Sequence, residues 1–312
     1  MTALLDVILP VFLIIGFGYA AAYAKLFDEG AVDGVMRFAQ NFAAPCLLFK
    51  SVAQLDLASD YHPALLASFY AGAFAGFGLG YFGARRLFGR SAAESVAIGF
   101  ACLFSNSLLL GLPITERAYG TEALSGNYAI ISVHAPLLYG FGITLMELVR
   151  SKGAGLSVPR LTTQVLRAIL SQPLVIGIIA GFTVNLSGFA LPQVASSAVD
   201  MMAGTAIPSA LFGLGGVLLR YRPEGDIKCI TMVCVCSLVV HPGVTYLLGR
   251  YAFGLSVPDL RSAVITGAMA PGVNAFLFAN MYGVAKRVAA SAVLIGTAAT
   301  IVTAWLWLSI LP

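Results

Sequence analysis

The fold is decided by two apolar segments that each carry a proline near the middle. They read FACLFSNSLLLGLPITERAYG over residues 100–120 and ITGAMAPGVNAFLFANMYG over residues 265–283. Proline lacks a backbone donor and clashes with the preceding helical turn, so Pro113 and Pro271 predict helix breaks. Irregular backbone at membrane depth is tolerated only inside protein or beside a wet cavity. The segments therefore predict two interrupted helices that border a polar centre.

The composition is that of a membrane protein. The chain has 312 residues, of which 59% are hydrophobic and 10% charged, and its mean hydropathy is +0.90. A soluble domain carries about 25% charged residues, and a membrane-spanning helix needs about 20 mostly apolar ones. Ten apolar segments are predicted to span, at 3–24, 32–54, 63–84, 92–117, 125–149, 164–186, 193–219, 228–249, 260–283 and 288–311.

Basic residues fix the expected orientation. Thirteen Lys and Arg residues flank the exits of the odd-numbered segments, and three, Arg117, Arg250 and Arg261, flank the others. Basic loops face the cytoplasm in membrane proteins. We therefore expect both termini to lie outside, in a multi-pass protein.

The chain also repeats itself weakly. At an offset of 163 residues, Pro10 falls on Pro173, Gly18 on Gly181, Pro45 on Pro208 and Tyr119-Gly120 on Tyr282-Gly283. The offset predicts a first five-helix repeat at 1–149, a cytoplasmic linker at 150–163 and a second repeat at 164–312. Because five is odd, the second repeat is inverted, as in many secondary transporters.

Matching breaks in both repeats indicate a transport site at the centre. Each second half-helix is expected to point its N-terminus at this centre, where free N–H groups and the positive dipole end favour a carboxylate. Taken singly, each break is equally typical of an ordinary proline kink. The predicted substrate-binding residues in the breaks are Ser105, Asn106, Ser107, Gly111, Pro113, Pro271, Gly272 and Asn274.

Three short motifs in this order and spacing resemble the auxin efflux carrier family, especially its bacterial members. They are NFAAPCLLFKSVA at 41–53, SNSLLLGLPI at 105–114 and APGVNAFLFANMYG at 270–283. The resemblance covers essentially the whole chain. It implies ten helices with crossing discontinuous helices four and nine, a bile-acid-symporter-like or antiporter-like fold, elevator-type alternating access and a homodimer.

The resemblance also implies a substrate class and a location. Family substrates are organic carboxylates, and small dicarboxylates such as malonate or malate are favoured for a bacterial member. Asn106 matches the family's carboxylate-binding asparagine, and Pro113 and Pro271 match its crossover prolines. The short basic stretch between segments five and six replaces the long loop of plant members, which favours a bacterial inner-membrane carrier.

Two further polar residues within apolar segments are functional candidates, because ionisable groups are costly there. His134, in ISVHAPLLYG, is a candidate substrate contact or proton carrier, and Asp200 a candidate coupling-ion site. A structural role is the alternative for both.

Other function classes fit less well. A sodium- or proton-coupled cation or bile-acid-type transporter is the alternative function, although no acidic residue lies within either break. The three histidines provide no H-E-x-x-H, and no G-x-S-x-G occurs, so no enzyme is predicted. No cofactor, metal site or nucleic-acid partner is expected; the expected partners are a small organic anion and the lipid bilayer.

Overall fold

The computed structural model describes residues 3–151 and 158–312, and over these ranges the chain is helical without a strand. The first half contains η1 (Ala3–Ile8), α1 (Leu9–Tyr23), α2 (Glu29–Phe38), η2 (Ala39–Ala43), α3 (Ala44–Gln54), α4 (Leu57–Asp60), α5 (Pro63–Leu87), α6 (Ala92–Leu103), η3 (Ser107–Gly111), α7 (Leu112–Tyr119), η4 (Thr121–Leu124) and α8 (Ser125–Arg150). The predicted all-α class is confirmed.

The second half follows the same pattern of long and broken helices. It contains α9 (Val158–Leu170), α10 (Pro173–Ser187), α11 (Gln193–Gly204), α12 (Ala206–Arg220), α13 (Ile227–Val235), η5 (Cys236–Val240), α14 (His241–Leu247), η6 (Leu248–Ala252), α15 (Val257–Gly267), α16 (Val273–Tyr282) and α17 (Lys286–Ile310). Part of the expected linker, 152–157, lies outside the described residues.

Within the described ranges, six helical stretches are long and apolar enough to cross a membrane: Leu5–Tyr23, Pro63–Leu87, Thr121–Arg150, Gln193–Arg220, Ile227–Ala252 and Lys286–Ile310. A bent pair, α9 with α10, makes a seventh if it is counted as one span. The expected segments 92–117 and 260–283 are divided into shorter helices, so neither reaches the length of a single span. The protein is thus a multi-pass membrane protein with at least two interrupted segments.

One expected segment is bent sharply. The sequence predicts a span over 164–186, but α9 and α10 meet at an angle of 80°. The cause is Pro173, because the residue before a proline is driven out of the helical region, and Gln172 is indeed extended (φ −78°, ψ 120°). The apolar helix proper therefore begins at Pro173, and α9 runs across its end.

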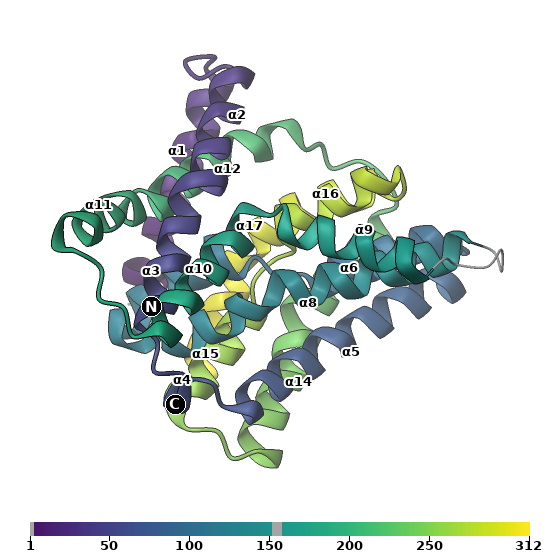
Figure 1. Cartoon of the computed structure of the whole chain (residues 1–312). Helices are drawn as coiled ribbons and strands as arrows, with labels where there is room; N and C mark the ends of the chain where they lie inside the picture. Colours follow the sequence, from purple (N-terminus) through teal and green to yellow (C-terminus); the bar gives the residue numbers. More distant parts are fainter. Residues whose placement is uncertain (1–2, 152–157) are drawn as a thin grey trace.

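The helices pack in two groups, visible in Figure 1. On the left of the view, α1 lies along α12 and α3 lies along α10, with α2 and α11 beside them. Through the lower, central and right-hand parts of the view, α5, α6, α8, α14, α15, α16 and α17 pack against one another. We call these groups the panel and the core.

Close backbone contacts within the panel follow the sequence repeat. A Cβ on Gly18 of α1 would lie 1.9 Å from the carbonyl oxygen of Phe212, and a Cβ on Gly181 of α10 would lie 2.8 Å from that of Phe49. Both pairs are related by the offset of 163, since Gly181 follows Gly18 and Phe212 follows Phe49 by that number. The same close contact between a glycine and a backbone carbonyl thus occurs twice, once with the glycine in the first half and once with the glycine in the second half.

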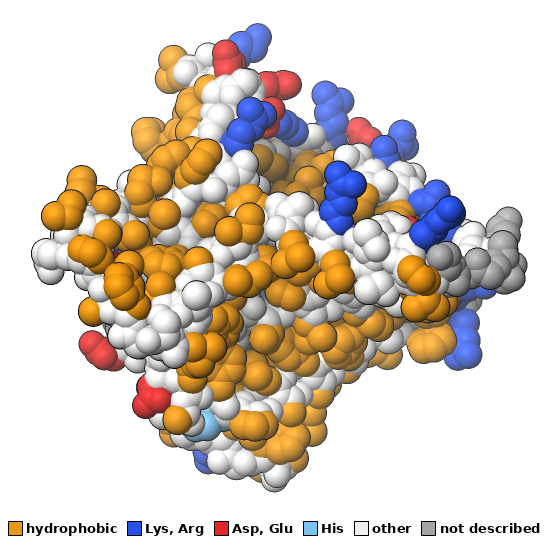
Figure 2. All heavy atoms as spheres, viewed as in Figure 1, with side chains coloured by type: hydrophobic (Ala, Val, Ile, Leu, Met, Phe, Trp, Pro, Cys, Tyr) orange, Lys and Arg blue, Asp and Glu red, His pale blue; other side chains and the backbone are white. Residues whose placement is uncertain are grey.

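Charge is distributed unevenly over the surface. In Figure 2, Lys and Arg side chains gather along the upper and right-hand edges, near the α1–α2 turn and the end of α16, while hydrophobic side chains cover the middle. A bare apolar belt with basic residues at one end is the surface expected of a membrane protein.

The glycine contacts generate a stability prediction. Gly18→Ala will lower the melting temperature of the detergent-solubilised protein, because the added methyl meets backbone rather than a flexible side chain; overpacking costs about 1–3 kcal/mol. Gly16→Ala on the same helix is the matched control, since a Cβ there meets none of the described atoms within 4 Å. A fluorescence-monitored thermal melt checks this, and equal melting temperatures for the two variants would contradict the close packing of α1 on α12.

Candidate functional site

The two helix breaks meet in the structure. Ser105 and Pro271 form an isolated antiparallel bridge, in which Asn106 donates its backbone N–H to the Ala270 carbonyl (2.8 Å) and Gly272 donates to the Phe104 carbonyl (2.9 Å). These bonds satisfy buried backbone groups that the breaks remove from helical pairing, which membrane-embedded backbone requires. The interrupted segments therefore run past each other at their extended centres.

A small cavity of about 120 Å³ lies beside this bridge. Six predicted residues line it: Ser105, Asn106, Ser107, His134, Gly272 and Asn274. Its other walls come from η2, from α3 and α10 of the panel and from α8 and α16 of the core. The cavity thus lies between the panel and the core, and we call it the central cavity.

Three predicted residues lie near the central cavity without lining it. Gly111 and Pro113 belong to the helix that leads away from the break. Pro271 lies in the bridge, with its Cδ 3.0 Å from where a Cβ on Gly296 of α17 would be. These residues shape the backbone of the crossing rather than the cavity wall.

Unpaired polar atoms face this region. Asn106 and His134 are buried, with 6% and 4% of their surface exposed, yet the Asn106 Nδ2 and both ring nitrogens of His134 have no hydrogen-bond partner among the described residues. Ser105 and Ser107 share a bond between their hydroxyls (2.9 Å). Buried polar groups are nearly always paired, so the free amide and imidazole are suited to a polar ligand in the cavity.

Helix ends add to this polarity. The helix formed by η3 and α7 begins at Ser107, and α16 begins at Val273, both at the cavity wall. The first N–H groups of a helix have no partner within it, and its N-terminus carries a partial positive charge of about one half. Two such ends at one cavity favour an anion.

Sequence reasoning missed three polar residues of the cavity, namely Gln40, Asn41 and Gln172. Gln40 and Asn41 lie just before the proline of the second apolar segment, and Gln172 precedes Pro173, which matches Pro10 in the repeat. Their positions close to prolines that recur in the sequence repeat could have identified them as candidates for the cavity. The lining, as far as the structure describes it, contains no Lys, Arg, Asp or Glu.

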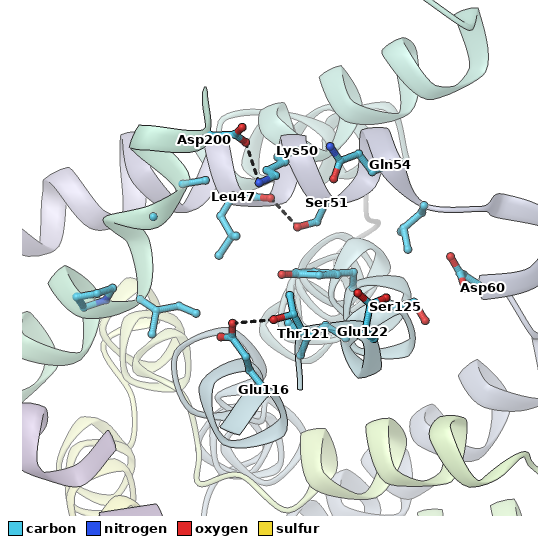
Figure 3. A pocket seen from close by; sticks show the side chains of 17 residues that line it. Leu47, Lys50, Ser51, Gln54, Asp60, Glu116, Thr121, Glu122, Ser125 and Asp200 are labelled. Carbon is cyan, nitrogen blue, oxygen red and sulfur yellow. Dashed lines mark hydrogen bonds and ion pairs between the residues drawn. The ribbon is translucent and has the colours of Figure 1, made fainter. Parts of the chain in front are cut away.

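A wider cavity of about 690 Å³ opens elsewhere (Figure 3). Asp60, Glu116 and Glu122 line it, as do Lys50 and Asp200, whose Nζ and Oδ1 atoms are 2.7 Å apart. Asp200, the coupling-ion candidate, therefore lies in this acidic cavity and outside the central one. Its pairing with Lys50 is partly exposed, and such pairs contribute at most about 1 kcal/mol.

A third cavity, of about 470 Å³, is lined mainly by basic charged residues, in contrast to the acidic cavity. Its charged lining comprises Asp33, Glu224, Arg220, Arg222, Lys286 and Arg287. It shares Gln40, Val273 and Leu277 with the central cavity. The central cavity therefore borders the basic end of the molecule, while the acidic cavity shares none of its described lining residues with it.

Comparison with known proteins identifies the family. A family profile described as "Membrane transport protein" matches residues 3–308, and it represents the auxin efflux carrier family. The chain belongs to this family. The resemblance expected from the three motifs is thereby confirmed, and the protein is a membrane transporter.

Individual relatives of this carrier are distant. An uncharacterised transporter of Methanothermobacter thermautotrophicus is 24% identical over 272 residues, which cover 85% of this chain and 86% of that protein. A candidate malonate transporter of Rhizobium meliloti is 25% identical, over 79% of this chain and 77% of its own. The lysosomal cholesterol signaling protein of Mus musculus is 26% identical over 258 residues. The aligned region covers 78% of this chain but only 29% of that longer protein.

The arrangement of the cavities predicts how they can be reached. In a background with the native cysteines replaced, Gln40→Cys will react with a membrane-impermeant thiol reagent added at the basic face. Gln54→Cys, in the acidic cavity, will react only from the opposite face. Labelling in vesicles of known orientation measures both, and reaction of the two positions from one face would contradict the separation of the cavities.

Proposed function

We propose that the protein is a secondary active transporter of small organic carboxylates, bound in the central cavity. The observation that carries this proposal is the meeting of an unpaired amide, at Asn106, with two helix N-termini at one cavity whose described lining is uncharged. Amide donors and helix ends complement a carboxylate without the cost of burying a cationic side chain. Asn274, on the first turn of α16, offers a second amide.

The substrate favoured is a small dicarboxylate such as malonate or malate. The central cavity is small, which suits a short acid better than a large aromatic one. The relative from Rhizobium meliloti, named for malonate, supports the same class.

The architecture proposed for this transporter is ten membrane-spanning helices in two inverted repeats, divided as 1–149 and 164–312. Support comes from the reciprocal contacts of Gly18 and Gly181 and from the matching breaks that cross at Ser105 and Pro271. Each interrupted segment counts as one span in this proposal, as does the stretch from α2 to α3.

Alternating access follows from the two packing groups. The central cavity lies between panel and core, so a movement of the core along the panel carries a bound anion between the basic and acidic ends. This is an elevator-type mechanism, in which the crossing travels as one unit with the core. The proposed setting is a bacterial inner membrane, with the basic end in the cytoplasm, both termini outside and two copies forming a homodimer.

A cation transporter of the related fold is the second candidate. It is favoured by the acidic cavity, where Asp60, Glu116, Glu122 and Asp200 outnumber Lys50. The central cavity argues against a cation transporter, because its described lining contains no carboxylate that could bind a cation.

Substitution of the two amides tests the proposed site. Asn106→Ala and Asn274→Ala will each reduce carboxylate uptake at least tenfold, since the loss of one hydrogen bond to a charged group costs about 1.5–3 kcal/mol. Asn280→Ala is the matched control, because Asn280 lies on the same helix α16 but is exposed and outside the cavity. Uptake into proteoliposomes is measured, and normal uptake by both cavity variants would remove these residues from the site.

Transport itself is tested with the purified protein in proteoliposomes. Mono- and dicarboxylates are screened with and without sodium and proton gradients. Saturable uptake of a group of small carboxylates is expected. A response to sodium or protons alone, with every carboxylate silent, would support the cation transporter instead.

A further inference from the structure

The central cavity carries too little positive charge for a dianion. Over the described residues its lining holds no Lys or Arg, and its two helix N-termini together supply about one positive charge. A monocarboxylate is balanced by this arrangement, but the second carboxylate of a dianion is not. An uncompensated charge in a low-dielectric site is costly, so a second positive charge is needed.

His134 is the titratable side chain in the cavity wall that can supply this charge. It is held between aromatic rings, with Phe104 at 4.7 Å and Phe69 at 5.7 Å between ring centroids. Neither ring nitrogen makes a hydrogen bond of good geometry in the described part of the chain, although the Ser105 backbone lies near the ring. One nitrogen can therefore take up a proton while the other donates to a ligand oxygen. A carboxylate within about 4–6 Å favours the protonated form of such a group.

The titratable groups packed closest to His134 in the described structure are tyrosines and a second histidine. Tyr70 of α5 lies beside it, with its hydroxyl donated to the Ile130 carbonyl. His241 of α14 packs against the same Phe69 ring, with 4.8 Å between ring centroids. Tyr61 is bonded to Ser132, one half-turn earlier on α8.

The charged groups on neighbouring elements are engaged elsewhere. Glu147 accepts from Gln164 of α9 and from Tyr282 of α16, and it lies 13 residues along α8, or about 20 Å. Lys50 of α3 and Glu122 of η4 line the acidic cavity, and Asp259 of α15 accepts from Ser256 and His62.

We propose that His134 binds one proton together with a dicarboxylate, so that the protein carries the dianion as a proton–anion pair. This rests on the proposed function. The imidazole nitrogen takes the proton from water on the side where the substrate enters and returns it to water on the side where the substrate leaves. The loaded site then carries a net charge near zero, and monocarboxylates need no such proton.

Isothermal titration of the full-length protein with malonate, in two buffers of different ionisation enthalpy at a pH above 7, measures the protons taken up on binding. The native protein is expected to take up about one proton with malonate and far fewer with acetate. His134→Gln is expected to lose this uptake and to weaken malonate binding at least tenfold, by a larger factor than it weakens acetate binding. His62→Gln, an exposed histidine paired with Asp259, is the control and is expected to behave as the native protein.

The outcomes separate the two proposals. Malonate binding by the native protein without proton uptake would overturn this inference while leaving the carboxylate transporter in place. Proton uptake that persists in His134→Gln would place the proton on the ligand or on another group, and would also overturn it. If no carboxylate binds, the proposed function fails, and the inference fails with it. Should His134→Gln not fold, the native protein still tests the coupling: equal proton uptake with malonate and acetate would overturn the inference.

Discussion

The rest of the structure depends on two backbone hydrogen bonds at the crossing of the interrupted segments. By donating to Ala270 and Phe104, the N–H groups of Asn106 and Gly272 let extended backbone persist inside the membrane. Helix ends that would otherwise be buried without partners then converge on one cavity. The crossing therefore serves the fold and the site together: the same breaks that need pairing also expose the N–H groups available to an anion.

The site is polar and, over its described lining, uncharged, and this has physical consequences. A buried lysine or arginine would hold an anion tightly and would be costly to leave unpaired in the empty carrier. Amides and helix ends avoid that cost in the proposed site. The charged groups are kept at the two ends of the molecule, basic at one and acidic at the other, where they act on ions over longer distances.

The sequence alone predicted the helical class, the two breaks and six of the residues that line the central cavity. A proline and a cluster of polar side chains are costly inside an apolar helix unless the helix is interrupted there. The sequence did not predict the 80° bend before Pro173, since the apolar pattern continues through Ile169 and Leu170. Gln40, Asn41 and Gln172 were missed because they reach the cavity from the panel, which no local pattern reveals. The pairing of Asp200 with Lys50 is likewise a tertiary contact between α11 and α3.

A small carboxylate is proposed to bind at the crossing of the interrupted segments. An experimental structure of the protein in lipid with saturating malonate tests this proposal. Ligand density is expected in the central cavity, with one carboxylate beside the amide of Asn106 and the N-terminus of α16. Density confined to the acidic cavity around Lys50, with the crossing empty, would contradict it.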